Sequence, residues 1–292
     1  MTDPVPPKRV FEPARAEAET AAQATLSPQT VDPAYRLAFQ DMDFLLREDL
    51  RPVRFQLELL KPELLLDEAN IASTFVFYGS ARIPEPAKAD ALIAAASTES
   101  QRRTAERLKA NSKYYDVSRQ LARLASRHEL DEDGKRHFVV CSGGGPSIME
   151  AANRGACDEG KESIGLNIVL PHEQMPNPYV TPSLSFQFHY FALRKMHFLL
   201  RARAVAVFPG GFGTFDESFE LLTLIQTGKV KPIPILFFGK DFWERVINFE
   251  ALAEEGVIAQ KDLELFSYCE SAEEAWEHVC RHYAGTPGGT DC

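Results

Sequence analysis

Short apolar runs alternate with longer amphipathic segments along most of the chain. Five apolar runs of strand length predict strands that pass into loops, at residues 74–82, 137–145, 163–170, 204–214 and 232–239. Apolar residues at helical spacing predict the helices, at residues 35–48, 53–69, 87–128 (as two helices), 146–160, 191–202, 215–228, 241–255 and 271–284. Strands that are apolar throughout and alternate with helices indicate a parallel sheet covered on both faces. The pattern therefore predicts an α/β fold with extra helices before the first strand.

Both ends of the chain lack this pattern. Residues 1–33 are rich in Pro, Ala, Glu and Thr, and such a segment cannot repay its ordering entropy by burial. Residues 286–292 have the same character. We therefore predict a mobile tail at 1–33, a single domain at 34–285 and a flexible C-terminus at 286–292. The chain of 292 residues is 45% hydrophobic and 25% charged, which is ordinary for a soluble globular protein.

The net charge and the cysteine content limit the classes of binding partner and the cellular compartment that we expect. The formal net charge of −10 disfavours a nucleic-acid polymer as partner. No apolar run reaches the roughly 18 residues of a membrane helix, and the N-terminus has no hydrophobic signal core, so we expect no membrane partner. The five cysteines form no CxxC pair, which favours reduced thiols in the cytoplasm. A single phosphate needs only local features, so an acidic chain can still bind a mononucleotide.

The strongest chemical signal is PGGFGTFDE at residues 209–217, where a predicted strand passes into a predicted helix. Glycines let backbone N–H groups turn toward an anion, and the helix adds its positive N-terminal end. The segment is no Walker loop, because no GK[ST] follows, and it lacks the GxGxxG spacing of dinucleotide sites. The structural alternative is a tight turn with a capping box from Thr214 to Glu217. Both interpretations can hold together.

A second glycine loop, CSGGGPSIMEAANRGA from Cys141, also joins a predicted strand to a predicted helix. Its three consecutive glycines, Gly143 to Gly145, allow close approach of a ligand to the backbone. Alone, such a loop is a weak nucleotide signal, and Ser147 with Glu150 again has capping-box spacing. A second glycine loop in one sheet favours a nucleotide site, since ligands of parallel sheets bind at the carboxyl ends of the strands.

The sequence holds other residue types that could carry chemistry. The pair Arg194-Lys195 would usually be solvated surface, although arginine can bind phosphate through two hydrogen bonds. The histidines show no HExxH or Cys/His ligand spacing, which predicts no metal site. Ser80 is outside any GxSxG elbow, which disfavours a serine hydrolase.

These segments together resemble one known family. PGGFGTFDE resembles the PGGxGTxxE signature of the Lonely Guy family of cytokinin-activating phosphoribohydrolases, whose members are often described as lysine decarboxylases. The family's Arg-Lys pair matches Arg194-Lys195, 23 residues before Glu217. GSAR at 79–82 and GGGPSIMEAANRGA at 143–156 resemble its nucleotide loops. The resemblance covers roughly residues 70–255 and is greatest to bacterial AMP nucleosidase-type members, which share GGGPxxMEAANRGA and LPHEQ segments.

The resemblance implies a Rossmann-like parallel sheet and a homodimer or larger homo-oligomer with the site near the interface. It implies hydrolysis of the N-glycosidic bond of a nucleoside 5′-monophosphate, AMP or a modified AMP such as a cytokinin riboside 5′-monophosphate, to base and ribose 5-phosphate, without a cofactor. Carried over by position, the catalytic residues are Arg194 and Glu217. The implied substrate-binding residues are Gly79, Ser80, Gly143, Gly144, Gly145, Met149, Glu173, Lys195, Gly210, Gly211, Phe212, Gly213, Thr214 and Thr223.

In this reading the Glu217 carboxylate stabilises an oxocarbenium-like ribosyl cation, and the helix N-terminus favours its ionised form. A non-catalytic nucleotide or molybdenum-cofactor carrier of the same fold is the alternative, because fold alone does not decide function. A lysine decarboxylase needs a Schiff-base lysine and a pyridoxal site. Lys195 is the only lysine in these motifs, and its neighbours suggest phosphate contact.

Overall fold

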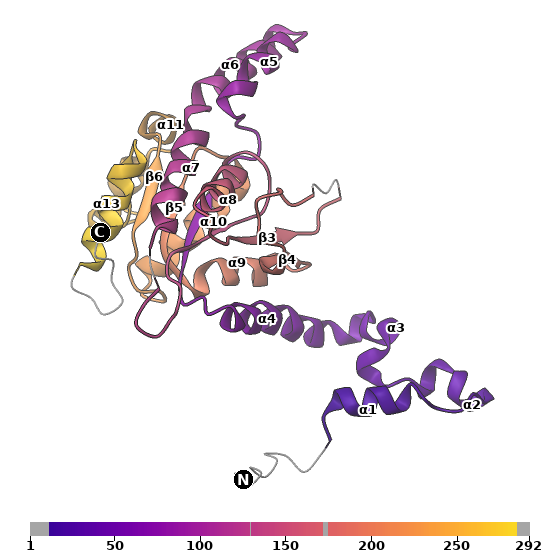
Figure 1. Cartoon of the computed structure of the whole chain (residues 1–292). Coiled ribbons are helices and arrows are strands. Elements are labelled where there is room, and N and C mark those ends of the chain that lie inside the picture. Colours follow the sequence, from indigo (N-terminus) through magenta and orange to yellow (C-terminus); the bar gives the residue numbers. More distant parts are fainter. Residues whose placement is uncertain (1–11, 129, 172–174, 285–292) are drawn as a thin grey trace. The chain divides into compact units, whose positions relative to one another are not determined.

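The computed structural model describes residues 12–128, 130–171 and 175–284 (Figure 1). The chain divides into two compact units, Met1–Glu58 and Leu59–Cys292, which are described separately. The first unit holds three short helices, three 3-10 turns and the start of α4, and none of its described residues is buried. Its elements are α1 (Ala14–Ala21), α2 (Pro28–Val31), η1 (Pro33–Tyr35), η2 (Ala38–Gln40), α3 (Met42–Leu45), η3 (Glu48–Leu50) and α4 (Arg51–Glu68).

The single helix predicted at 35–48 is wrong, because short turns and α3 occupy that stretch. Asp41 explains the break, since its carboxylate accepts from the Phe44 N–H (3.2 Å) and starts α3 as an N-cap. Aspartate favours caps over helix interiors for this reason. Helices α1 and α2 lie within the tail predicted at 1–33, and residues 1–11 and 286–292 lie outside the described residues. The mobility of both ends stays a prediction.

The second unit is built on a parallel sheet of seven strands in the order β4-β3-β2-β1-β5-β6-β7. The strands are β1 (Thr74–Tyr78), β2 (Val139–Ser142), β3 (Ile164–Ile168), β4 (Ser185–Phe188), β5 (Ala202–Val207), β6 (Ile235–Phe238) and β7 (Ser267–Cys269). The predicted α/β fold with a Rossmann-like parallel sheet is confirmed. From β1 the chain proceeds to one edge and then returns to β5 on the other side. That reversal is a topological switch point, where ligands of such sheets bind.

The sequence pattern missed the two edge strands. In β4, buried Phe186 and Phe188 flank exposed Gln187, and β7 has only three residues. Edge strands are short and partly exposed, so they lack the continuous apolar run that marks a central parallel strand.

Helices cover both faces of the sheet. They are α5 (Pro86–Ala94), α6 (Glu99–Asn111), α7 (Lys113–Ser126), α8 (Ile148–Asp158), α9 (Phe191–Leu200), α10 (Phe212–Gln226), α11 (Lys240–Val246), α12 (Phe249–Glu254) and α13 (Ala272–Tyr283), with 3-10 turns η4 (Pro182–Leu184) and η5 (Gln260–Leu265). The segment 87–128 therefore forms three helices where two were predicted, and 241–255 forms two where one was predicted. Caps cause these divisions: Thr98 forms a capping box with Gln101 at the start of α6, and Asn248 caps α12.

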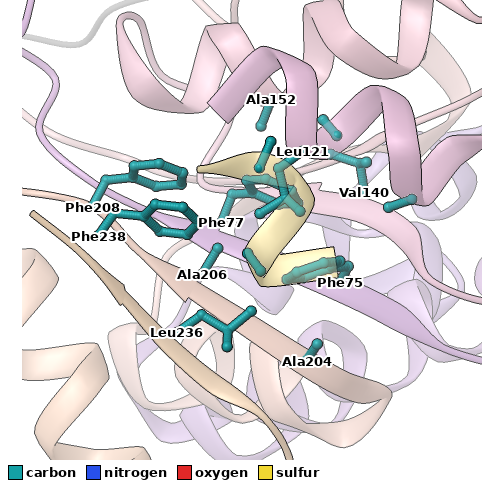
Figure 2. Packing of buried hydrophobic residues seen from close by; sticks show 14 of the residues in the cluster. Phe75, Phe77, Leu121, Val140, Ala152, Ala204, Ala206, Phe208, Leu236 and Phe238 are labelled. Atoms are coloured by element: carbon teal, nitrogen blue, oxygen red, sulfur yellow. The ribbon is translucent and has the colours of Figure 1, made fainter. Parts of the chain in front are cut away.

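The two faces of β1 have different neighbours. Phe75 and Phe77 belong to the main core (Figure 2). Helices α7, α8 and α13 contribute buried residues to this core. The rings of Phe208 and Phe238 stack in the same core with centroids 4.3 Å apart (Figure 2). Side chains alternate along a strand, so Val76 and Tyr78 point to the opposite face. There Tyr78 meets Phe198 of α9 edge to face.

Within the described residues, no helix is both long and apolar enough to span a membrane, and no group of three or more His, Cys, Asp or Glu side chains could hold a metal ion. Cys141, Cys157 and Cys269 are free thiols, whereas Cys280 is disulfide-bonded. The prediction of five reduced cysteines is therefore wrong at Cys280. Sequence spacing alone does not show which thiols a fold brings together.

Candidate active site

A cleft of about 660 Å³ lies at the carboxyl ends of β1, β2 and β5, at the switch point of the sheet. Loops after these three strands, the start of α10 and the inner face of α9 form its walls. The lining residues are Phe77, Tyr78, Gly79, Ser80, Ala81, Arg82, Gly143, Met149, Arg194, Phe198, Gly211, Phe212, Gly213, Thr214, Phe215 and Glu217. The structure thus brings together residues from four predicted motifs in one place: the GSAR loop, both glycine loops with the helices that follow them, and the Arg-Lys pair.

The start of α10 presents free backbone donors to this cleft. The helix begins at Phe212, with Gly211 as its N-cap and without any side-chain cap. The first N–H groups of a helix have no partner inside the helix, and they carry its positive dipole end. A Cβ atom on Gly211 or Gly213 would meet nothing within 4 Å, so the space beside these amides is open. The arrangement suits an anion such as a phosphate.

The capping box predicted from Thr214 to Glu217 is wrong. Both residues lie inside α10, and each is only 7% exposed. The turn before α10 brings the backbone of residue 210 close to Thr214. Only glycine fits at this position, since a Cβ atom on Gly210 would lie 2.1 Å from the Thr214 hydroxyl oxygen. Glu217 is therefore free of a capping role, and its carboxylate lines the cleft.

Burial controls the protonation of Glu217. It raises the pKa of the carboxyl group to about 7, against the opposing effect of the Arg194 and Lys195 charges. Loss of solvation therefore outweighs the favourable charges of Arg194 and Lys195, and the expected effect of the helix N-terminus on the ionised form stays a prediction. A buried acid that titrates near neutral pH, in a cleft and beside a cation, is typical of a functional group.

Arg194 is held over the cleft from α9. Its Nε donates to the Leu166 carbonyl (2.7 Å), and its guanidinium lies 5.0 Å above the Phe198 ring centroid. Its Nη1 is 3.6 Å from Glu217 Oε1, an ion pair longer than a direct hydrogen bond. Gly143 leaves room for this side chain, since a Cβ atom there would lie 2.6 Å from Arg194 Nη2.

The loop of Gly143 to Gly145 differs from the start of α10. The Gly144 N–H donates to Ser142 Oγ (3.0 Å), and Asn177 Nδ2 donates to the carbonyls of Gly144 (3.1 Å) and Gly145 (3.0 Å). Of the three glycines, only Gly143 lines the cleft, together with Met149 from α8. The Gly144 N–H and the carbonyls of Gly144 and Gly145 are therefore used within the protein.

The capping box predicted for Ser147 and Glu150 is also wrong. Ser147 has a positive φ of 67°, and its hydroxyl donates to the Ile83 carbonyl. Glu150 accepts from the Tyr115 hydroxyl (3.1 Å) on α7. These contacts join the second glycine loop to the GSAR loop and to α7.

Some predicted binding residues lie away from the cleft. Lys195 Nζ contacts Asp216 (2.7 Å) and Glu220 (3.3 Å). Partial burial alone would lower the pKa of Lys195. The two carboxylates outweigh this effect and raise the pKa above its ordinary value. Thr223 is exposed and borders a separate small groove, and Glu173 lies outside the described residues.

The sequence reasoning missed Tyr78, Arg82 and Phe198, which also line the cleft. Arg82 was visible as the last residue of GSAR, and its N–H donates to Ser80 Oγ (3.0 Å). Tyr78 was visible only as one apolar residue of a predicted strand. Neighbouring strand residues point to opposite faces of the sheet, and Tyr78 lies on the face that α9 covers. The sequence alone did not show which face α9 would cover.

Comparison with known proteins adds to this geometry. The family model described as "Possible lysine decarboxylase" matches residues 149–279. The cytokinin riboside 5′-monophosphate phosphoribohydrolase LOG2 of Arabidopsis thaliana is 25% identical over 150 residues, which are 50% of this chain and 65% of that protein. The pyrimidine/purine nucleotide 5′-monophosphate nucleosidase of Escherichia coli K12 is 28% identical over 126 residues, 40% of this chain and 27% of that protein. The resemblance to the Lonely Guy family is confirmed.

The solved structure of the molybdenum cofactor carrier protein from Chlamydomonas reinhardtii is also similar, at 15% identity and a TM-score of 0.40, over 72% of this chain and 97% of that chain. The family-model match at 149–279 contains α9, β5 and α10, and therefore both Arg194 and Glu217. In the described part of the chain the cleft has no lysine in its lining, and Lys195 is ion-paired outside it. The cleft thus offers no lysine for the Schiff base that an amino-acid decarboxylase needs.

Proposed function

We propose that this protein hydrolyses the N-glycosidic bond of a nucleoside 5′-monophosphate to free base and ribose 5-phosphate. The observation that carries the proposal is Glu217, a buried carboxyl group one turn into a helix whose open N-terminus lies in the same cleft. The matched relatives are named for reactions of this kind, over part of their own length. AMP, or an AMP with a modified base, is the substrate we propose.

The phosphate binds at the start of α10, where the amides after Gly211 and the Thr214 side chain face the cleft. Fixing the phosphate holds the ribose deeper in the cleft, over the Glu217 carboxylate. Such positioning replaces a random encounter of substrate and catalytic group. Arg194 supplies a positive charge beside that carboxylate.

The raised pKa of Glu217 suits the chemistry. Breaking the N-glycosidic bond gives C1′ an oxocarbenium-like positive charge. A carboxylate that is poorly solvated in the free protein is strongly stabilised when the positive charge at C1′ develops beside it. This stabilisation of the transition state lowers the activation barrier for cleavage of the glycosidic bond. The base leaves with the bonding electrons and water attacks C1′. The proton that the water gives up balances the one that the departing base takes up, so the products are neutral base and ribose 5-phosphate.

The test is a panel of nucleoside 5′-monophosphates with chromatography of the products. We expect free adenine and ribose 5-phosphate from AMP, and a loss of at least about a hundredfold in Glu217→Gln. Asp216→Asn is the matched control, because Asp216 is the adjacent carboxylate, is exposed and lies outside the cleft. We expect this control to keep near-normal turnover. Tight AMP binding without release of base would indicate a carrier and would contradict the proposal.

We also propose a homodimer or larger homo-oligomer as the working unit, in the cytoplasm, where mononucleotides are abundant. Phe212 supports the first point, since its side chain is 96% exposed at the mouth of the cleft and an association would cover it. Light scattering of the purified protein measures the mass directly. A monomer that hydrolyses AMP at full rate would contradict the oligomer.

A further inference from the structure

Tyr78 ends β1 on the face of the sheet that carries Arg194 and Glu217. Phe77 belongs to the core on the other face, and neighbouring strand residues point to opposite sides. The Tyr78 ring meets Phe198 of α9 edge to face, with centroids 5.1 Å apart. Tyr78 therefore belongs to the lining of the cleft and packs there against α9.

The hydroxyl group of Tyr78 has no hydrogen-bond partner within the described residues, although the residue is only 5% exposed. Buried hydroxyl groups in folded proteins nearly always have a partner, so an exception needs an explanation. Thr74 and Ser126 also have buried hydroxyl groups without a partner, but neither lines the cleft. A ligand in the cleft is the natural partner for Tyr78.

The neighbours of Tyr78 indicate the chemistry of that ligand group. Burial, with the negative charge of Glu217, raises the pKa of Tyr78 well above its ordinary value, so the phenol keeps its proton and can donate. Phe198 supports Tyr78 on one side and the Arg194 guanidinium on another. A phosphate is disfavoured so close to Glu217, whereas a sugar hydroxyl can accept the phenol proton and donate its own.

We propose that Tyr78 hydrogen-bonds the ribose 2′-hydroxyl and makes the cleft select ribonucleotides over 2′-deoxyribonucleotides. The inference rests on the proposed function, in which Glu217 faces C1′ of the ribose. C2′ is bonded to C1′, so a group beside Glu217 reaches the 2′-hydroxyl before the 3′-hydroxyl. A site that bonds a hydroxyl rejects the analogue without it, because the protein's own polar group is then left unpaired.

The test uses AMP, 2′-deoxy-AMP and 3′-deoxy-AMP with the wild-type protein and with Tyr78→Phe. The ratio of kcat/KM for AMP to kcat/KM for 2′-deoxy-AMP is compared between the two proteins, so the intrinsic reactivities of the two glycosidic bonds cancel. We expect Tyr78→Phe to lower this ratio by about tenfold or more. The ratio for AMP to 3′-deoxy-AMP should stay unchanged. Equal losses on all substrates, no loss, or a change confined to 3′-deoxy-AMP would overturn the inference.

Tyr114→Phe is the matched control, because its hydroxyl donates to Glu270 (3.2 Å) and lies outside the cleft. We expect Tyr114→Phe to lower the melting temperature and keep both ratios. Tyr78→Phe should keep or raise the melting temperature, since it removes an unpartnered hydroxyl. If the wild-type protein hydrolyses none of the nucleotides, the proposed function fails. Dissociation constants for the same nucleotides then test the role of Tyr78. If Tyr78→Phe leaves the ratio of the dissociation constants for 2′-deoxy-AMP and AMP unchanged, the inference is overturned.

Discussion

The glycine loops at 143–145 and 210–213 follow the two strands that flank β1, and both pass into a helix. In the first loop, Ser142 accepts from the Gly144 N–H, and Asn177 donates to the carbonyls of Gly144 and Gly145. In the second, α10 starts without a side-chain cap, and the space at Gly211 and Gly213 is open. The first loop therefore shapes the cleft and makes room for Arg194, while the second provides the donors for an anion. Glycine content alone does not distinguish these roles.

Gly144→Ala should give the largest loss of stability. Gly144 has a φ of +72°, and a Cβ atom there would lie 2.2 Å from Asn167 Oδ1. We expect the free energy of unfolding to fall by about 3 kcal/mol, from backbone strain and forced displacement of Asn167. Denaturant unfolding measures this change. A loss below about 1 kcal/mol would show that the loop is less constrained than its hydrogen bonds indicate.

Asn177→Ala should give the second-largest loss of stability. Asn177 is buried, and its side chain also donates to Asn153 Oδ1 (2.9 Å). Removing it leaves the carbonyls of Gly144 and Gly145 without that donor, for a loss of about 2 kcal/mol in the free energy of unfolding. Thermal unfolding and AMP turnover are measured together. A strong loss of turnover with unchanged stability would mean that Asn177 contacts the substrate.

Glu217 should make stability depend on pH. The folded chain binds its proton more tightly than the unfolded chain, with a pKa of about 7 against an ordinary 4.5. This contribution to the free energy of unfolding is fully present below about pH 4.5 and is lost as pH rises through about 7. We expect Glu217→Gln to remove that fall, measured as the difference in melting temperature between the two proteins across pH 4 to 8. If the difference in melting temperature between the two proteins stayed constant with pH, the Glu217 carboxyl group would not have the raised pKa.

Gly211→Ala should have the smallest effect on stability. Its φ is negative, and a Cβ atom would meet nothing within 4 Å, so the free energy of unfolding should change by less than about 0.5 kcal/mol. The added methyl group occupies the open space beside the amides, so the KM for AMP should rise. Initial rates measured against AMP concentration check this. An unchanged KM would remove the second loop from the proposed phosphate site.

Much of this arrangement follows from the sequence. Apolar strands between helices predicted the parallel sheet, and Arg194 and Glu217, which the family resemblance identified, do meet in the cleft. Lys195 shows the limit, because neighbours on a helix point in directions about 100° apart. Arg194 therefore faces the cleft while Lys195 meets Asp216 and Glu220. The unpartnered hydroxyl of Tyr78 depends on how α9 packs against β1. The Thr214 capping box failed because α10 already starts at Phe212. The Ser147 box failed because the Ser147 hydroxyl, although it stands at the N-cap of α8, donates to the Ile83 carbonyl.

The pH dependence of kcat for AMP tests the central claim most directly, since it concerns the Glu217 carboxylate in the substrate complex. Release of adenine at saturating AMP, measured from pH 5 to 9, should rise with pH to a plateau, because only the ionised Glu217 carboxylate stabilises the ribosyl cation. The residual rate of Glu217→Gln should lack this rise. A wild-type rate that is flat across this range, or the same rise in Glu217→Gln, would contradict the claim that Glu217 performs the chemistry.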